Sequence, residues 1–241
     1  MLYRSNRFFL AILAMLLAQN VSAAEVLVNG GFESGDFTGW SVTANGASSC
    51  DSDWTVVTTN SICSSVSDPA PAEGVYQAAN SFDGNGPQEF RLVQAVSVPS
   101  GVQAATLSWQ QQYRVSNGGT EPRTFEVLIT DAADSATLAT IDSQSFTGST
   151  NSGGWDTISF DISSALAPLA GQSVNIVFRN FIPEAFTGPG NFALDDVSLD
   201  ITAAEPAPVP VPLLPVWALL LLGALVTGVA GRHSRRIRNP R

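Results

Sequence analysis

Apolar residues recur along the chain in short runs that alternate with polar residues, and Gly, Asn, Asp, Ser and Pro separate the runs. Alternation with a period of two is typical of strands that bury one face, and the 3.6-residue spacing of a long helix is absent. The pattern predicts about ten strands and one helical turn near 162–169, which together indicate an all-β fold, a jelly-roll β-sandwich over residues 25–202. The expected strands lie near 25–29, 39–43, 54–59, 74–80, 89–97, 103–115, 123–131, 136–142, 155–161, 173–181 and 191–201.

The first 24 residues follow a different pattern. Arg4 and Arg7 precede an apolar run from Phe8 to Ala18, and small residues stand at 22–24. This layout predicts a secretory signal peptide over residues 1–24 that is cleaved. The alternative is a first membrane anchor, although the apolar run is shorter than the ~20 residues that a bilayer requires.

The C-terminal end predicts a membrane anchor. A proline-rich linker over residues 203–212 precedes an uncharged apolar segment, 213–231, which we expect to be a transmembrane helix. A basic tail, residues 232–241, carries five arginines and is expected in the cytoplasm. Both ends therefore predict an exported protein at the bacterial envelope or cell surface, anchored at first in the inner membrane through its C-terminal helix.

The same end resembles the bacterial C-terminal sorting tails that exosortase-type transpeptidases process. Val211-Pro212-Leu213-Leu214 stands where one class of these tails has Ile-Pro-Thr-Leu, and Trp217 matches the tryptophan of the Ser-Glu-Trp that follows. The threonine and the Ser-Glu pair of that class are absent here. The resemblance implies a sorting transpeptidase of the envelope as a partner; the alternative is a plain single-pass anchor.

Charge and residue types exclude several functions. Residues 25–204 contain four arginines and twenty carboxylates, a balance of 4 − 20 = −16, so nucleic acid is not expected as a partner. The chain has no lysine, its one histidine is His233 in the basic tail, and no nucleophile-elbow or phosphate-binding motif is present. We therefore expect no enzyme activity; a glycoside-active enzyme that uses two carboxylates is the remaining catalytic alternative.

Cys50 and Cys63 are the only two cysteines. In an oxidising compartment we expect them to form a disulfide, which would stabilise the fold by roughly 3 kcal/mol. A free reactive pair or a metal site is the alternative.

Two adjacent carboxylates interrupt the apolar run Asn191–Ile201. Strand alternation gives Asp195 the same side as Val197 and Leu199, which predicts that Asp195 faces the core and that Asp196 faces outward. A buried carboxylate requires a partner. Because lysine is missing and arginine is scarce, a bound cation is one candidate for that partner.

The opening VLVNGGFESGDFTGW and the closing NFALDDVSLDI resemble the two ends of galactose-binding-like jelly rolls, among them carbohydrate-binding modules and MAM-type adhesion domains. The resemblance implies a structural calcium ion held by Glu33 and Asp195, with Asp196 beside them and Asn29 as a further donor. Calcium binds six to eight oxygen atoms, and the glycines after Asn29 allow backbone carbonyls to approach. Alternatively, Glu33 caps a turn and Asp195 accepts backbone N–H groups without a metal.

A polar row predicts a ligand-binding face. Ser108, Gln110, Gln112 and Arg114 alternate with apolar residues, so one side of that strand presents amides and a guanidinium, groups that bind sugar hydroxyls. Arg179 joins the row if its strand is a neighbour, and Trp54 is the candidate for stacking on a sugar, whereas Trp40 and Trp155 are expected in the core. The alternative is an ordinary solvated strand face.

Together these observations predict an exported, calcium-stabilised, non-catalytic module that binds a glycan or extracellular matrix. A purely structural or adhesive surface protein is the competing hypothesis.

Overall fold

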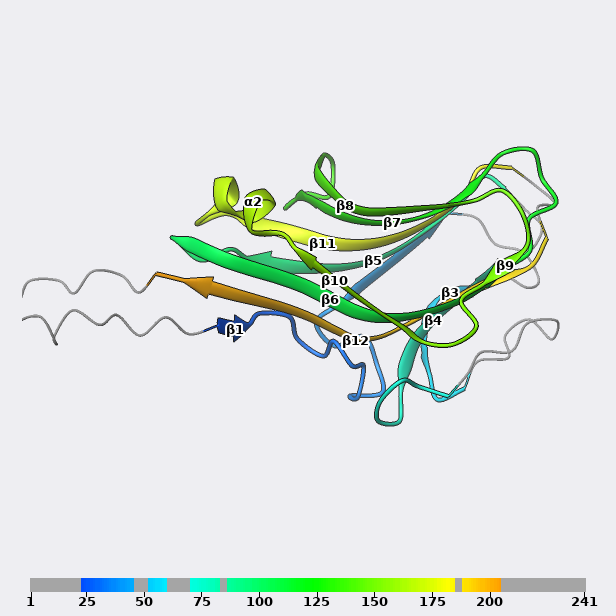
Figure 1. Cartoon of the computed structure of the whole chain (residues 1–241), viewed down its shortest axis with the longest axis horizontal. Helices are drawn as coiled ribbons and strands as arrows, with labels where there is room; N and C mark the ends of the chain where they lie inside the picture. Colours follow the sequence, from blue (N-terminus) through cyan, green and yellow to red (C-terminus); the bar gives the residue numbers. More distant parts are fainter. Residues whose placement is uncertain (1–22, 46–51, 60–69, 83–85, 185–187, 205–241) are drawn as a thin grey trace, which may run out of the picture. The chain divides into compact units, whose positions relative to one another are not determined.

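The computed structural model describes residues 23–45, 52–59, 70–82, 86–184 and 188–204, which form a sandwich of two antiparallel β-sheets (Figure 1). The chain divides into two units, residues 1–205 and 206–241. Several predicted features lie outside the described residues. They are residues 1–22 of the predicted signal peptide, both cysteines, the linker beyond Ala204, the apolar segment and the basic tail. Within the described ranges, no helix combines the length and apolarity that crossing a membrane requires.

One sheet has seven strands, in the order β10-β6-β12-β4-β3, with β1 added to β12 and β9 added to β6. The longest pair in it is formed by β6 and β12, which lie antiparallel over almost their whole lengths. Its strands are β1 (Ala23–Glu25), β3 (Ser52–Val57), β4 (Gln77–Phe82), β6 (Val102–Val115), β9 (Thr150–Asn151), β10 (Asp156–Asp161) and β12 (Gly190–Ala203).

The other sheet has five strands, in the order β2-β5-β11-β7-β8. They are β2 (Ser41–Asn45), β5 (Gln88–Ser97), β7 (Arg123–Asp131), β8 (Thr137–Phe146) and β11 (Ser173–Ile182). A single helical turn, α2 (Ser163–Leu166), continues into a 3₁₀ turn, η1 (Ala167–Leu169), between β10 and β11. This is the helical turn that the sequence predicts.

The strand order confirms the jelly roll. The main strands from β4 onward form two four-stranded sheets with the orders β10-β6-β12-β4 and β5-β11-β7-β8. These are the two sheets of a jelly roll, which consists of two Greek keys. The strand expected near 25–29 overlaps the observed β1 only at Glu25, and the first two residues of β1 belong to the predicted signal peptide, 1–24. Beyond Val26 the chain crosses toward the other sheet, where the side-chain amide of Gln94 on β5 binds both the N–H and the carbonyl of Val28, at 2.7 and 2.9 Å.

The core lies between the two sheets and is rich in aromatic rings. The ring of Phe178 on β11 contacts Trp109 on β6 edge-on, with centroids 5.6 Å apart, and Phe125 stacks on Phe192 at 4.7 Å. Trp40 is buried against Phe178, as predicted. Such pairs stabilise by about 0.5–1.5 kcal/mol each beyond the burial of their area.

The prediction that Asp195 shares the core side with Val197 and Leu199 is wrong. Asp195 lies opposite Gln110 of β6, but Ser198 lies opposite Ser108, so β12 contains one extra residue between them. This β-bulge is centred on Asp196, which has a positive φ of 49°. The extra residue reverses the alternation, and Asp195 therefore lies on the outer side of the seven-stranded sheet, the side of Gln110.

Candidate functional site

A tight turn near the N-terminus lies directly against the bulge in β12. Asn29 and Phe32 both have positive φ, and Phe32 is fully buried beside Trp40, whose indole N–H donates to the Asn29 carbonyl at 3.1 Å. The Val197 N–H donates to the Gly30 carbonyl at 3.0 Å. A Cβ atom at Gly30 would lie 1.7 Å from the Val197 carbonyl oxygen, so only glycine permits this contact.

The turn brings Glu33 to Asp195, the two carboxylates that the sequence pairs. A Cβ atom at Gly31 would lie 3.8 Å from Cγ of Glu33 and 3.9 Å from Oδ1 of Asp195. Both carboxylates accept backbone N–H groups from one segment, residues 72–76. Glu33 Oε1 accepts from Val75 and Tyr76 at 2.9 Å each, and Asp195 Oδ2 accepts from Glu73 at 3.1 Å. We call Glu33, Asp195 and residues 72–76 the carboxylate junction.

Asp195 is buried without a cationic side chain. It is only 1% exposed, and none of the ion pairs among the described residues includes it. Loss of hydration in this position raises the pKa of Asp195 to about 6, although the N–H groups of Glu73 and Asp196 counteract the rise. A cation bound at this place would reduce the cost of the buried charge.

The other two predicted metal ligands have different positions. The side chain of Asn29 holds its own turn, because Nδ2 donates to the carbonyl of Asp36 at 2.9 Å and Oδ1 accepts from the Ser34 N–H at 3.2 Å. Asp196 is exposed, and its N–H donates to Oδ1 of Asp195 at 2.8 Å. The junction therefore brings together Glu33 and Asp195 and leaves Asn29 to the turn.

The junction fits part of a calcium coordination shell. Within the described residues, no three side chains of His, Cys, Asp or Glu are placed to hold a metal together. Glu33 and Asp195 offer hard carboxylate oxygens at one place, and a calcium ion there would complete its shell with backbone carbonyls and water. The same carboxylates also satisfy N–H groups of residues 72–76, as the metal-free alternative expects.

The predicted polar row lies on the outer side of β6, as the alternation indicates. Gln110 and Gln112 are half-buried and Arg114 is exposed. The Thr157 hydroxyl on β10 donates to Oε1 of Gln110 at 3.1 Å, whereas Oε1 of Gln112 is enclosed and accepts no hydrogen bond from a described residue. Of the three, Arg114 is thus the side chain most accessible to a ligand.

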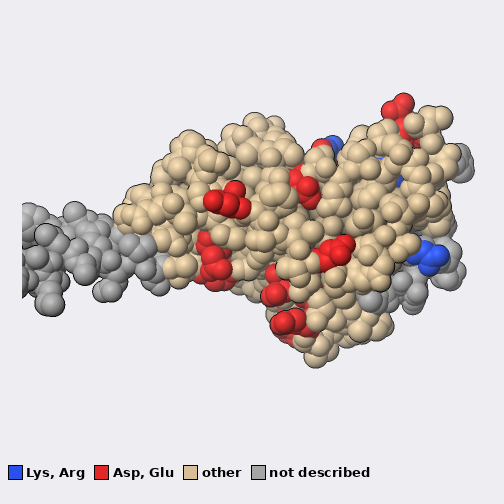
Figure 2. All heavy atoms as spheres, viewed as in Figure 1, with Lys and Arg blue, Asp and Glu red and all other residues tan. Residues whose placement is uncertain are grey.

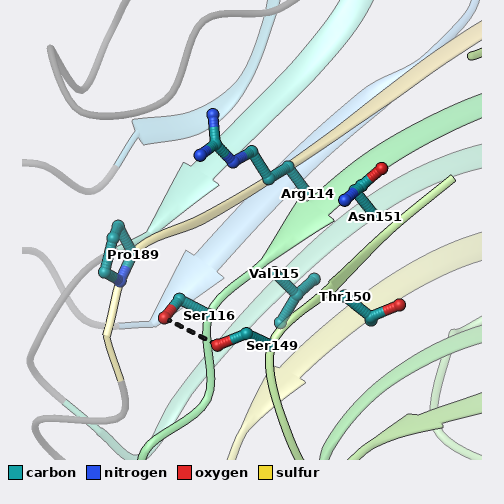
Figure 3. Close-up of a pocket in the computed structure, with 7 residues that line it drawn as sticks. All are labelled: Arg114, Val115, Ser116, Ser149, Thr150, Asn151 and Pro189. Atoms are coloured by element: carbon teal, nitrogen blue, oxygen red, sulfur yellow. Dashed lines mark hydrogen bonds between the residues drawn. The ribbon is translucent and has the colours of Figure 1, made fainter. Parts of the chain in front are cut away.

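Arg114 leads into a cleft at the end of the sheet (Figure 3). The cleft has a volume of about 350 Å³, and its wall combines hydroxyl, amide and guanidinium groups with two apolar side chains. At its base the hydroxyls of Ser116 and Ser149 lie 3.2 Å apart and share a hydrogen bond. We call it the distal cleft, and it is lined by Arg114, Val115, Ser116, Ser149, Thr150, Asn151 and Pro189.

Strand register places the distal cleft far from the ends of the domain. Val115 pairs with Gly190 at the start of β12, whereas Val102 pairs with Ala203 at its end, so the fourteen residues of β12 separate the two places. Ala23 of β1 pairs with Thr202, next to that second end. Both ends of the folded domain therefore lie together, opposite the cleft (Figure 1).

Arg179 does not join the polar row, because β11 belongs to the other sheet. Its guanidinium binds Glu126 at 2.5 Å and Glu89 at 3.1 Å on the outer side of the five-stranded sheet. Arg91 extends this network by binding Glu89 at 2.8 Å and Asp134 at 2.6 Å. The five charges alternate in sign and are each about one-fifth to one-quarter exposed, so they hold β5, β11 and β7 together across the sheet face.

The network gives a prediction for acid pH. Burial alone would raise the pKa of Glu89, but Arg179 and Arg91 outweigh it and hold that pKa below its ordinary 4.5. Its stabilisation is therefore complete above pH 4.5 and is lost as pH falls through the lower folded value. Glu89→Gln should lower the free energy of unfolding by about 2 kcal/mol at pH 7, and less at pH 3, in urea titrations.

Glu126→Gln is the control for this prediction. Glu126 binds Arg179 and, among the described residues, no second arginine, so its replacement should cost less than that of Glu89. A loss for Glu89→Gln that is the same at pH 7 and pH 3 would show that its charge does not stabilise the sheet.

Two tryptophans do not have the positions that the sequence suggests. Trp54 is 3% exposed and belongs to the core, so its expected role as an exposed stacking residue is wrong. It lies on β3, an edge strand that packs one side against the core, and not in an open loop. Trp155 is only half-buried outside that core, and its indole N–H donates to the Ala70 carbonyl at 3.0 Å.

Charge on the surface is mostly negative. Figure 2 shows acidic side chains scattered over the visible face and few basic ones. Within the part of the chain that the structure describes, the residues that line the distal cleft include no carboxylate, and Arg114 is the one charged residue among them.

Comparison with solved structures finds other β-sandwich domains. The carbohydrate-binding module TmCBM61 in complex with β-1,4-galactotriose is 18% identical and aligns over 73% of this chain and 97% of its own, with a TM-score of 0.44. The K3 adhesin domain of Lys-gingipain from Porphyromonas gingivalis is 18% identical over 73% and 98%, with a TM-score of 0.46. A family 11 carbohydrate-binding module from Clostridium thermocellum is 13% identical over 77% and 99%, with a TM-score of 0.40.

These values do not establish a family or a ligand for this chain, and the jelly-roll fold rests on the strand order itself. No family model and no curated protein matches the sequence.

Proposed function

We propose that this protein is an exported, non-catalytic binding module that recognises a glycan in the distal cleft. The observation that carries the proposal is the make-up of that cleft, a hollow of about 350 Å³ whose hydroxyl, amide and guanidinium groups are suited to sugar hydroxyls. Binding pockets of this size use a few placed polar groups to orient their ligand. The cleft also lies at the end of the sandwich opposite Ala23 and Ala203.

The chemistry of the cleft favours binding over catalysis. Hydrolysis of a glycosidic bond generally requires two carboxylates on either side of the bond, and none of the described residues that line the cleft is a carboxylate. Elsewhere the buried Asp195 has its two oxygens engaged with the N–H groups of Glu73 and Asp196. The ligand therefore leaves the cleft unchanged.

Calcium and the route of export complete the proposal. A calcium ion at the carboxylate junction would tie the N-terminal turn, residues 72–76 and β12 into one rigid unit. The N-terminal and C-terminal segments of the sequence support export, anchoring in the envelope and sorting by a transpeptidase. In this arrangement the sandwich acts outside the cell as a surface-held receptor for a polysaccharide.

A glycan array with the purified full-length chain identifies the ligand, and variants then locate its site. Thr150→Ala and Asn151→Ala each remove one neutral hydrogen-bonding group from the cleft and should weaken binding about 2–10-fold in calorimetry. Both side chains are exposed, so the melting temperature should not change.

The matched control is Thr43→Ala. Thr43 lines a smaller cavity, of about 220 Å³, beside Glu89 and Arg91 on the opposite sheet. If Thr43→Ala weakens binding and the two cleft variants do not, the site lies on the five-stranded sheet instead. If no glycan binds, a structural or adhesive role replaces the proposal.

A further inference from the structure

Arg114 differs from the other arginines of the domain. Arg91 and Arg179 each bind two carboxylates on the five-stranded sheet. Arg123 is 2% exposed, lies over the ring of Phe82 at 4.7 Å and donates to the Gly188 carbonyl. Arg114 is exposed, lines the distal cleft and forms no ion pair with a described residue.

This isolation stands out in so acidic a domain. Residues 25–204 contain twenty carboxylates and four arginines, so potential partners for an arginine are many. The described residues that line the cleft beside Arg114 are nevertheless all neutral. At physiological ionic strength, charges farther away than about 8 Å are largely screened. Among the described residues that line the cleft, the only formal charge is therefore positive, although the domain as a whole is strongly negative.

The arrangement of the cleft suits an anionic sugar. A guanidinium presents two parallel N–H groups that match the oxygens of a carboxylate or a sulfate ester. Arg114 on β6 is paired directly with Asn151 on β9, and the hydroxyls of Ser116 and Ser149 lie below them in Figure 3. One acidic group can thus bind Arg114 while hydroxyls of the same or the next sugar bind the neutral side chains.

We infer that the ligand of the distal cleft is an acidic glycan, whose carboxylate or sulfate group binds the guanidinium of Arg114. This inference rests on the proposed glycan-binding function and names its substrate class. Charged hydrogen bonds of this kind contribute about 1.5–3 kcal/mol, which corresponds to roughly a 10–100-fold preference over a neutral polymer of the same backbone.

Affinity measurements with matched polymers test the inference. Polygalacturonate and its fully methyl-esterified form share one backbone and differ in whether each sugar carries a carboxylate or a neutral methyl ester, and dextran sulfate differs from dextran in its sulfate groups. The full-length chain should bind one of the two acidic polymers at least 10-fold more tightly than its neutral counterpart. The pair that shows the difference identifies carboxylate or sulfate as the group recognised.

Variants assign the preference to Arg114. Arg114→Gln should abolish it, and Arg114→Lys should keep part of it, since lysine retains the charge without the planar fork. Gln103→Glu is the charge-matched control, because Gln103 is exposed near the other end of β6 and the change also lowers the net charge by one; it should leave the preference unchanged.

Three outcomes would overturn the inference. Equal affinity for acidic and neutral polymers, or an acidic preference that survives Arg114→Gln, contradicts it and leaves glycan binding intact. Failure to bind any glycan, on the array or among these four polymers, overturns the proposed function as well.

Discussion

Replacing Gly30 with alanine is expected to prevent the domain from folding stably. The added Cβ would lie 1.7 Å from the Val197 carbonyl oxygen, and the hydrogen bond from the Val197 N–H to the Gly30 carbonyl fixes the same two backbones. Both partners are main chain, so neither can rotate away as a side chain would. We expect a loss of more than about 4 kcal/mol, the range that only a few mechanisms reach, measured as the urea midpoint by circular dichroism.

Gly31→Ala is the matched control for this loss. The neighbouring glycine would place its Cβ 3.8 Å from Glu33 Cγ and 3.9 Å from Asp195 Oδ1, which are ordinary contact distances. It should change the free energy of unfolding by about 1 kcal/mol or less. Equal stability of Gly30→Ala and the unchanged protein would show that the N-terminal turn does not pack on the bulge of β12.

Chelation is expected to lower the melting temperature of the unchanged protein by about 5–10 °C. Calcium that binds only the folded chain stabilises it by about 2.7 kcal/mol at a hundredfold excess over Kd, and 1 kcal/mol corresponds to about 2–4 °C in a domain of this size. Asp195→Asn and Glu33→Gln should each erase most of the response to chelator. The double variant should add little, because both carboxylates act on one ion.

Asp196→Asn is the control for the calcium prediction, since Asp196 is exposed at the bulge whereas Asp195 is buried. It should retain the response. Identical melting curves with calcium and with chelator would favour the metal-free alternative, in which Glu33 and Asp195 only bind the N–H groups of residues 72–76.

The fold was predictable because it depends on a repeated local signal. Alternate residues of a strand, such as Leu107 and Trp109, are buried on the inner face of the sheet, and each strand shows that pattern in its own sequence. The bulge at Asp196 carries no such signal. One extra residue with positive φ moves the side chain of Asp195 to the other face of the sheet, and nothing in the sequence around the two aspartates indicates a bulge.

The candidate site was only partly predictable, because sheet order is not a local property. Arg114 was identified from the alternation of polar and apolar residues, which β6 keeps along the polar row. Arg179 was grouped with it on the assumption that β11 is a neighbour of β6, but the two strands belong to different sheets. Trp54 was misjudged because it lies between Cys50 and Cys63, which were expected to close a disulfide loop, whereas its burial follows from the pairing of β3 with β4. The distal cleft is formed by residues of β6, β9 and the segment before β12, which are far apart in the sequence. Ser149 and Asn151 could therefore be identified as lining residues only from the folded structure.

Hydrogen exchange of the full-length chain, with and without the glycan that the array identifies, tests the central claim most directly. If the glycan binds in the distal cleft, ligand should slow exchange at backbone amides in residues 114–116 and 149–151, which line it. Amides of residues 43–45 and 89–91 on the opposite sheet should exchange at the same rate with and without ligand. Protection confined to that second group, with exchange in the cleft unchanged, would show that the glycan does not bind in the distal cleft.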